Sequence, residues 1–149
     1  MIDYKLFNDR NKPSVTEKIA IVEFLYQHLE NFGDKKEDIE KAINYALKET
    51  ASFGGFILQS FEGHRISCVV VVNQTGMKGY IPENILVYVA THNKLRGKGI
   101  GKKMMKKAIE TADGSIALHV EPDNPARFLY EKLGFTNKYL EMRYIKDRS

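Results

Sequence analysis

Hydrophobic positions change their spacing several times along the chain, and each change predicts a different element. Residues 2–7 alternate between apolar and polar side chains, as in a short half-buried strand. Ser14 and Glu17 then have the spacing of a capping box, which predicts the start of a helix. The apolar face of that helix is expected to comprise Val15, Ile19, Val22, Leu25, Tyr26 and Leu29.

A second helix is expected after Gly33, which should end the first one. Asp34 and Glu37 repeat the spacing of a helix start. The buried face of the second helix is expected to comprise Ile39, Ala42, Ile43, Ala46 and Leu47. Gly54 and Gly55 then interrupt the helical pattern.

The rest of the chain predicts five strands and two helices. Strands are expected at 56–61, 66–72, 85–91, 116–120 and, closing the fold, 139–145, with helices at 99–112 and 125–133. Residues 62–64 would form a tight turn, and the polar segment 73–84 a loop.

That makes five strands after the first, in the order β-α-α-β-β-β-α-β-α-β. Because helices interrupt the strands, we predict an α/β fold (an α+β mixed sheet) with helices on both faces. No repeat or linker divides the 149 residues, so we expect a single domain over residues 1–149.

Composition restricts the compartment and the class of ligand. With 43% hydrophobic and 28% charged residues, the chain has the balance of a globular protein. No apolar run approaches the roughly 18 residues of a membrane span, and residues 1–5 lack the pattern of a signal peptide. The single cysteine, Cys68, cannot form an internal disulfide, which favours a cytoplasmic location. A net charge of +4 suits an anionic ligand but does not by itself indicate nucleic acid.

Residues 95–101, LRGKGIG, connect the strand expected at 85–91 to the helix expected at 99–112. Exposed backbone N–H groups in such a turn, together with the positive end of the helix dipole, favour a phosphate group. The spacing excludes a P-loop, and it excludes a dinucleotide fingerprint because the third glycine would fall at Lys102. An ordinary helix start with a solvated basic face explains the spacing equally well. That face carries Lys102, Lys103, Lys106 and Lys107.

A second motif, NPARFLYEKLGF, occupies residues 124–135. Asn124 suits a helix cap and Pro125 a first helical position. Tyr130 falls off the line of Leu129 and Leu133 and could therefore face a cleft. The alternative is a tyrosine packed between a helix and a sheet.

Together these segments resemble the GNAT superfamily of acetyl-coenzyme A-dependent N-acetyltransferases. The resemblance rests on residues 89–101, which contain an Arg-x-x-Gly-x-Gly motif, and on LYEKLGF at residues 129–135. It implies a GNAT-like, mostly antiparallel central sheet that splays between its fourth and fifth strands. It also implies that acetyl-coenzyme A is the acetyl donor.

The resemblance implies which residues bind this donor. Backbone amides of the turn would hold the pyrophosphate, and these belong to Arg96, Gly97, Lys98, Gly99, Ile100, Gly101 and Lys102. The backbone of Val89, Ala90 and Thr91 would pair with the pantetheine arm, and an N–H there would polarise the thioester carbonyl.

The family's asparagine on the following helix stands seven residues before the tyrosine, where this chain has Asp123. Asn124 lies one residue later and can donate a hydrogen bond without repelling an anion, so we favour it for this contact.

Tyr130 matches the family's general acid, which would protonate the departing thiolate. The implied reaction is direct attack of an amine on the thioester through a tetrahedral intermediate. A base is required because a free alkylamine is mostly protonated at neutral pH. Glu83 is the first candidate, followed by Tyr88 and His119. Each also has a structural explanation, as a solvated carboxylate, a core residue or a residue satisfied within the sheet.

The acceptor is expected to be a primary amine of a small molecule or of a protein or peptide. The resemblance places the acceptor pocket at about residues 26–35 and 73–84. Residues there that would suit a cationic amine are Tyr26, His28, Glu30, Phe32, Asp34, Tyr80 and Glu83. A homodimer is compatible with the family.

Two other functions fit parts of the pattern. A non-catalytic acyl-coenzyme A sensor would keep the turn, although the presence of Tyr130 disfavours it. A nucleic-acid-binding module would use the basic face of residues 102–107, but no aromatic residue interleaves with those lysines, so no nucleic-acid partner is expected. No metal is expected, since His28, His64 and His92 lack metal spacing, and Cys68 is expected to pack rather than react.

Overall fold

The computed structural model describes residues 3–147. The chain divides into two compact units, the first ending at Leu118 and the second beginning at His119. Among the described residues, no helix has the length and apolar character needed to cross a membrane. The expectation of a single domain over residues 1–149 stays a prediction.

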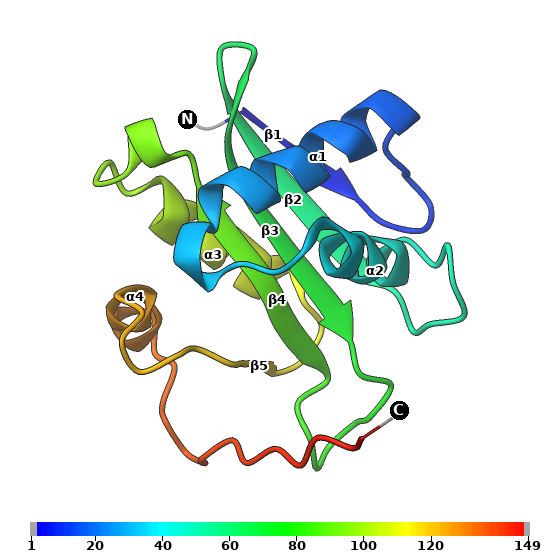
Figure 1. The fold of residues 1–149 in the computed structure, drawn as a ribbon, viewed down its shortest axis with the longest axis vertical. Coiled ribbons are helices and arrows are strands. Elements are labelled where there is room, and N and C mark those ends of the chain that lie inside the picture. The colour runs from blue at the N-terminus through cyan, green and yellow to red at the C-terminus, as the bar shows by residue number, and fades with distance from the viewer. Residues whose placement is uncertain (1–2, 148–149) are drawn as a thin grey trace. The chain divides into compact units, whose positions relative to one another are not determined.

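The first unit is built on a five-stranded sheet in the order β1-β2-β3-β4-β5 (Figure 1). Its strands are β1 (Asp3–Phe7), β2 (Gly55–Glu62), β3 (Arg65–Gln74), β4 (Asn84–Thr91) and β5 (Ile116–Leu118). The first four pair in antiparallel fashion, and only β4 and β5 run parallel. The predicted mixed, mostly antiparallel sheet is therefore confirmed.

β3 forms the centre of this sheet. Cys68 and the four valines that follow it have no exposed surface, as expected for a β-branched run that is covered on both faces. Gly63 lies in the predicted tight turn between β2 and β3 and has a φ of +65°, a conformation that favours glycine.

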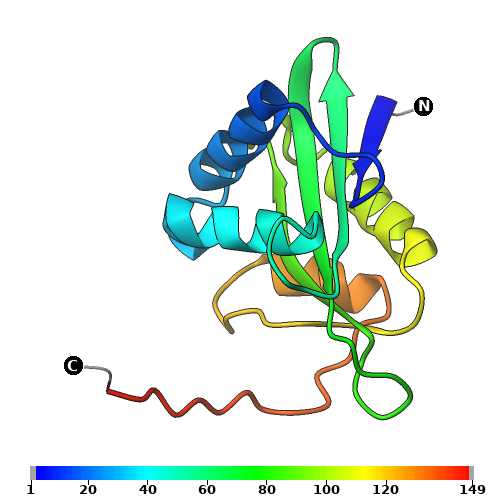
Figure 2. The same ribbon diagram turned by 90° about the vertical axis from the view of Figure 1, so that its right-hand side faces the viewer.

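Helices cover both faces of the sheet (Figure 2). Two of them, α1 (Val15–His28) and α2 (Lys36–Ala46), lie on one face, and α3 (Ile100–Thr111) lies on the other. The main core lies under α1 and α2. It comprises Phe7, Ile21, Val22, Phe24, Leu25, Ile39, Ile43, Ala46, Leu47, Ile57, Val69, Val71, Tyr88 and Ala90.

The start of α1 confirms the capping box. The Glu17 N–H donates to Ser14 Oγ at 3.1 Å, and Glu17 Oε1 accepts from the Ser14 N–H at 2.9 Å. Each side chain thus satisfies one of the backbone donors that a helix start leaves unpaired.

The predicted apolar face of α1 was wrong in part. Val15 is 77% exposed and Ile19 is 58% exposed. The face that contacts the core includes Ile21, Leu25 and His28, which follow helical spacing. His28 has a polar side chain, so the sequence pattern does not include it in an apolar face. In the structure it is buried and completes that face.

The connection between α1 and α2 also differs from the prediction. A short 3-10 helix, η1 (Glu30–Phe32), follows α1, and Lys35 rather than Asp34 is the N-cap of α2. The Asp34 carboxylate instead accepts a hydrogen bond from the Tyr88 hydroxyl at 2.5 Å. A tertiary contact has therefore taken the side chain that the local pattern assigned to a cap.

In α3, the packed face comprises the buried residues Met104, Met105 and Ala108, whereas Ile109 is 39% exposed.

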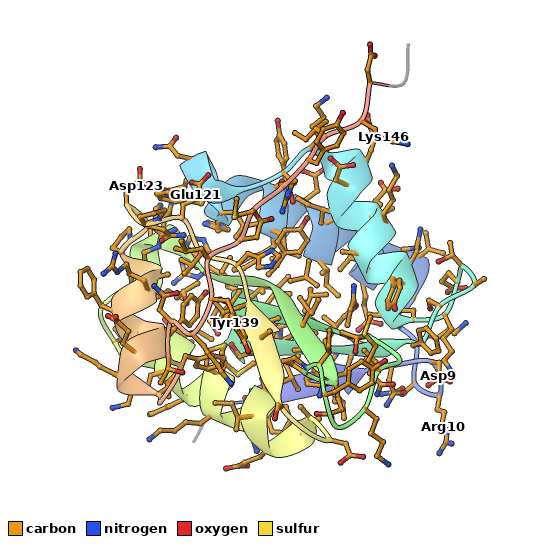
Figure 3. The ribbon with its side chains drawn as sticks, turned by 90° about the horizontal axis from the view of Figure 1, so that it is seen from below. Asp9, Arg10, Glu121, Asp123, Tyr139 and Lys146 are labelled. Carbon is orange, nitrogen blue, oxygen red and sulfur yellow. The ribbon has the colours of Figure 1, made fainter. Side chains whose placement is uncertain are left out.

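The second unit contains α4 (Ala126–Lys132), close to the predicted helix. In Figure 3, Glu121 and Asp123 mark the turn before α4, and Tyr139 and Lys146 mark the coil after it. The predicted closing strand at 139–145 was wrong: the described residues after α4 include no strand. Leu140 and Met142 are 84% and 89% exposed. Alternation is only a local preference, and a strand forms only where a partner strand takes up its backbone hydrogen bonds.

Replacing Ser14 by alanine should lower the free energy of unfolding by about 1 kcal/mol, because the cap to the Glu17 N–H is lost. Urea unfolding measures this change. Thr50→Ala, at an exposed turn position, is the matched control and should leave the midpoint nearly unchanged. Equal midpoints for the two variants would show that the cap does not contribute.

Candidate functional site

β4 carries a bulge at Val87, midway along the strand. Leu86 and Tyr88 pair with Val72 and Val71, which are consecutive residues of β3, so Val87 is the extra residue. On its other side, β4 pairs with β5 only as far as Leu86. The two strands therefore part where the bulge lies, which confirms the predicted splay.

The bulge also reverses the alternation of side chains along β4. Val71 and Val72 point to opposite faces of the sheet, so their partners Tyr88 and Leu86 do as well. Without the extra residue, Leu86 and Tyr88 would share a face. The bulge thereby directs Tyr88 and Ala90 into the core under α1 and α2.

Beyond the bulge, no described strand pairs with β4 on the side where β5 has ended. The His92 N–H donates to the Ser67 carbonyl of β3 at 2.8 Å. Because successive N–H groups of a strand point to opposite sides, those of Val89 and Thr91 point away from β3. An extended ligand could pair with these amides as a strand would.

After β4 the chain passes through the short 3-10 helix η2 (Asn93–Leu95) into the glycine turn, residues 96–101. Gly97 and Gly99 have φ values of +83° and +78°, in the left-handed region that favours glycine. A Cβ placed on either residue would meet no atom within 4 Å. Glycine is therefore needed here for the backbone conformation, and the surface over the turn is open to a ligand.

Gly99 is also the N-cap residue of α3, and none of the described side chains caps this helix. The first backbone bond of α3 runs from the Lys103 N–H to the Gly99 carbonyl at 3.1 Å. The preceding N–H groups, at residues 100–102, are the ones that a helix start leaves for a ligand. Lys98 and Lys102 are exposed beside them, so an anion at this end of α3 would find both amides and positive charge.

The Arg96 side chain is engaged within the protein. Its Nη2 donates to the His28 carbonyl at 2.8 Å and lies 3.4 Å from Glu30 Oε1, and its Nε lies 3.5 Å from the Thr91 carbonyl. Its guanidinium thus links the glycine turn to the end of α1. Because its side chain makes these contacts, Arg96 would bind a phosphate through its backbone N–H, as predicted.

Glu83, the first candidate base, lies directly before β4. Oε2 accepts from the Gly79 N–H at 2.9 Å, and Oε1 accepts from the Ser115 N–H at 2.8 Å. These backbone bonds hold the pKa of Glu83 below its usual range, so the carboxylate is charged at neutral pH. Glu83 therefore ties the loop before β4 to the segment before β5.

Tyr88 offers a hydrogen-bond donor rather than a base. Burial, and then its hydrogen bond to the Asp34 carboxylate, raise the pKa of Tyr88 well above its usual value. The phenol is therefore protonated at any ordinary pH. Its bond to Asp34 joins the connection between α1 and α2 to β4, one residue past the bulge.

Cys68 is fully buried, and this burial raises the pKa of its thiol to about 12. The thiol thus packs in the sheet, as expected, and is not a nucleophile at neutral pH.

Of the residues predicted for the acceptor pocket, Tyr26, Phe32 and Tyr80 are 51%, 38% and 79% exposed. The predicted catalytic and cofactor-binding residues that remain belong to the second unit. His119 is exposed. Asn124 Oδ1 accepts from the Ala126 N–H at 2.9 Å, so its carbonyl helps to start α4 and its amide NH2 remains the donor. Tyr130 is 8% exposed, and its ring packs edge-on against Phe135 at 5.9 Å between centroids. The choice between Asn124 and Asp123, which is exposed, stays open.

The contact between His28 and His92, beside the glycine turn, was not predicted; the sequence placed His28 in the acceptor pocket instead. The two rings are tilted with 4.2 Å between their centroids, and His28 is only 3% exposed. The helical spacing of His28 with Ile21 and Leu25 was the one sequence signal for its burial. The contact with His92 joins distant parts of the chain, and no local pattern could have indicated it.

Comparisons with known proteins agree with this arrangement. A family model described as an acetyltransferase (GNAT) domain matches residues 54–137. That segment includes the splayed strand, the glycine turn and α4. The comparison with curated proteins found no match.

Solved structures share the fold over nearly the whole chain. A GNAT family acetyltransferase from Streptococcus pneumoniae is 19% identical, covers 100% of both chains and has a TM-score of 0.69. An aminoglycoside 6'-N-acetyltransferase from Acinetobacter haemolyticus is 14% identical, covers 99% of each and has a TM-score of 0.67. A chain of the NatC complex bound to Gag peptide and CoA is 20% identical, with 91% of this chain and 84% of that chain covered and a TM-score of 0.67. On the family match and this shared fold, the chain belongs to the GNAT acetyltransferase family.

Proposed function

We propose that this protein transfers the acetyl group of acetyl-coenzyme A to a primary amine of a small molecule or of a protein or peptide. One observation carries the proposal. From Val89 to Lys102, the chain presents outward backbone amides along a splayed strand and then around an uncapped helix start. A ligand with an extended chain and a phosphate group at its end fits this arrangement. The chain would pair with the strand amides, and the phosphates would bind the amides at the helix start.

Acetyl-coenzyme A has this chemistry. The amides of Val89 and Thr91 would pair with the pantetheine arm, and those of residues 96–102 would hold the pyrophosphate. An amide beside the thioester would stabilise the developing oxyanion. CoA is also the ligand of the structurally similar NatC complex, which supports this choice of donor.

The chemistry needs one base and one acid. Glu83 would take a proton from the amine through water, and the free amine would attack the thioester carbon to form a tetrahedral intermediate. As that intermediate collapses, the C–S bond breaks and Tyr130 would protonate the thiolate. The new bond is the amide C–N bond, whose nitrogen loses its second proton to solvent. Solvent then takes the proton held by Glu83 and restores the proton that Tyr130 gave up. Asn124 would contribute a donor to the cofactor.

The acceptor is proposed to carry positive charge. Glu30 and Asp34 lie on the connection between α1 and α2, and Asp34 is bonded to Tyr88 on β4. Carboxylates there suit an ammonium group before it loses its proton. The similar solved structures include one named for an aminoglycoside and one bound to a peptide, so both acceptor types remain within the proposal.

Gly99→Ala should weaken acetyl-coenzyme A binding about tenfold, since an alanine at this left-handed position costs roughly 1–2 kcal/mol and displaces the turn. Calorimetry measures the dissociation constant. Gly63→Ala is the matched control, because Gly63 has a similar φ and open surroundings but lies in the turn between β2 and β3. Equal weakening in the two variants would mean that the glycine turn is not the binding site.

Tyr130→Phe should lower kcat by roughly a hundredfold or more, the usual contribution of a general acid, with little change in cofactor affinity. Released coenzyme A can be followed with a thiol reagent over a panel of amines, because the single protein thiol, Cys68, is fully buried. Tyr139→Phe, at an exposed tyrosine, is the control. An unchanged kcat would remove Tyr130 from the acid role, and no release with any amine would favour the non-catalytic sensor.

Glu83→Gln should lower kcat at least about tenfold while the dissociation constant for acetyl-coenzyme A stays the same, because glutamine cannot take up the proton. Since the low pKa of Glu83 keeps it charged, the wild-type rate should show no acidic limb from this group down to about pH 5. Asp113→Asn, a nearby exposed carboxylate, is the control. If Glu83→Gln lowers the melting temperature but not kcat, Glu83 is a structural residue only.

A further inference from the structure

The end of α1 meets the segment before the glycine turn through a cluster of three aromatic rings. The ring centroid of His28 lies 4.5 Å from that of Phe24 and 4.2 Å from that of His92, and the Phe24 and His92 centroids are 6.3 Å apart, with all three pairs tilted. Since His28 is only 3% exposed, its ring is part of the core on this side of the sheet. These ring contacts connect α1 to the residue that follows β4.

Both imidazoles accept backbone hydrogen bonds from η2. His28 Nδ1 accepts from the Asn93 N–H at 3.1 Å, and His92 Nδ1 accepts from the Lys94 N–H at 3.1 Å. A ring nitrogen that accepts an N–H cannot itself carry a proton, so both rings are neutral, with their proton on Nε2. These two bonds determine how the chain leaves β4 and enters the glycine turn.

The backbone carbonyl of His28 also contacts the glycine turn, at Arg96. It accepts from Arg96 Nη2 at 2.8 Å, and Glu30 lies 3.4 Å from the same nitrogen. The end of α1 therefore contacts the segment at Asn93 and again at Arg96, directly before Gly97. Movement of His28 would be passed to the proposed phosphate-binding amides.

The charges around this pair are mostly positive. His28 faces His92 at the start of η2, Arg96 in the glycine turn and Glu30 in η1. His92 faces Arg65 at the start of β3, together with Lys94 and Arg96. Burial first, and then these cations, hold the pKa of both rings below the ordinary 6.5. Glu30 is the one carboxylate among the named neighbours, and it is already paired with Arg96.

We propose that His28 and His92 position the cofactor turn as a neutral pair, and that protonation of either ring loosens η2 and weakens acetyl-coenzyme A binding. The inference rests on the proposed function. Both are positioning residues, because they act through the backbone of Asn93, Lys94 and Arg96. A protonated Nδ1 would become a donor facing another donor, and the new cation would face Arg96.

The direction of the pH effect follows from the neutral state. Because the folded protein prefers unprotonated rings, affinity and stability should be constant above about pH 7 and should fall as the pH drops below 6.5.

The test is calorimetry of acetyl-coenzyme A binding at pH 7.5, 6.5, 5.5 and 5.0. His28→Asn and His92→Asn, singly and combined, replace Nδ1 by an amide oxygen that accepts a hydrogen bond but does not titrate. Between pH 7.5 and 5.0, the wild type should lose about tenfold more affinity than the double variant. His64→Asn, at an exposed turn histidine, should behave like the wild type. Ionisation of the cofactor's own phosphates affects all variants alike and cancels in the ratio.

His28→Leu separates positioning from simple packing. Leucine fills the core but cannot accept the Asn93 N–H, so affinity should be low at every pH and His28→Asn should restore it. Equal pH profiles for the wild type and the double variant would overturn the proposal. Equal affinities for the leucine and asparagine variants would also overturn it.

Hydrogen exchange in the wild type, without cofactor, tests the pair independently of binding and of how well the variants fold. The amides of Asn93 and Lys94 should lose protection between pH 7 and 5, after correction for the intrinsic rate, while NMR shows both histidines titrating below 6.5. Unchanged protection would refute the inference. Absence of acetyl-coenzyme A binding by the wild type at pH 7.5 would instead refute the proposed function, and exchange would still decide whether the pair holds the turn.

Discussion

The bulge at Val87 is the constraint on which the proposed site depends. Every backbone N–H and C=O needs a partner, and β4 finds one on β5 only as far as Leu86. Past that residue the strand keeps β3 on one side, and no strand within residues 3–147 pairs with it on the other. The same extra residue turns Tyr88 and Ala90 into the core under α1 and α2. The inserted residue thus lies where the pairing with β5 ends and anchors β4 in the core, and the proposed ligand would pair with β4 beyond it.

Hydrogen bonds from α1 and from the connection that follows it hold β4 and the glycine turn at two places. Tyr88 bonds to Asp34 just past the bulge, and Arg96 bonds to His28 and Glu30 where the glycine turn begins. The connection between α1 and α2 therefore contacts both the middle of β4 and the turn that follows it. If the acceptor amine binds along this connection, as proposed, the elements that hold donor and acceptor share the same hydrogen bonds. Their geometry would then be set together rather than separately.

Prediction from the sequence succeeded where the cause of the structure is local. Ser14 and Glu17 are three residues apart and form the expected capping box. Gly97 and Gly99 have the left-handed conformation that a glycine-rich helix start requires. Prediction failed where the conformation depends on a residue far away in the chain. Asp34 bonds to Tyr88 instead of capping α2. Residues 139–145 alternate between apolar and polar side chains like a strand, but they are coil. The engagement of Glu83 with Gly79 and Ser115 likewise had no local signal.

By itself, the sequence determined the order of the elements up to α4, the glycine turn and the family motifs, because these follow from short-range sterics, helix capping and the period of apolar residues. Only the tertiary structure decided which side chains are free for chemistry. It placed the Arg96 side chain on His28 and Glu30 and paired the rings of His28 and His92. Such contacts join residues far apart in the chain, and their formation depends on how strands and helices pack, which no local spacing encodes.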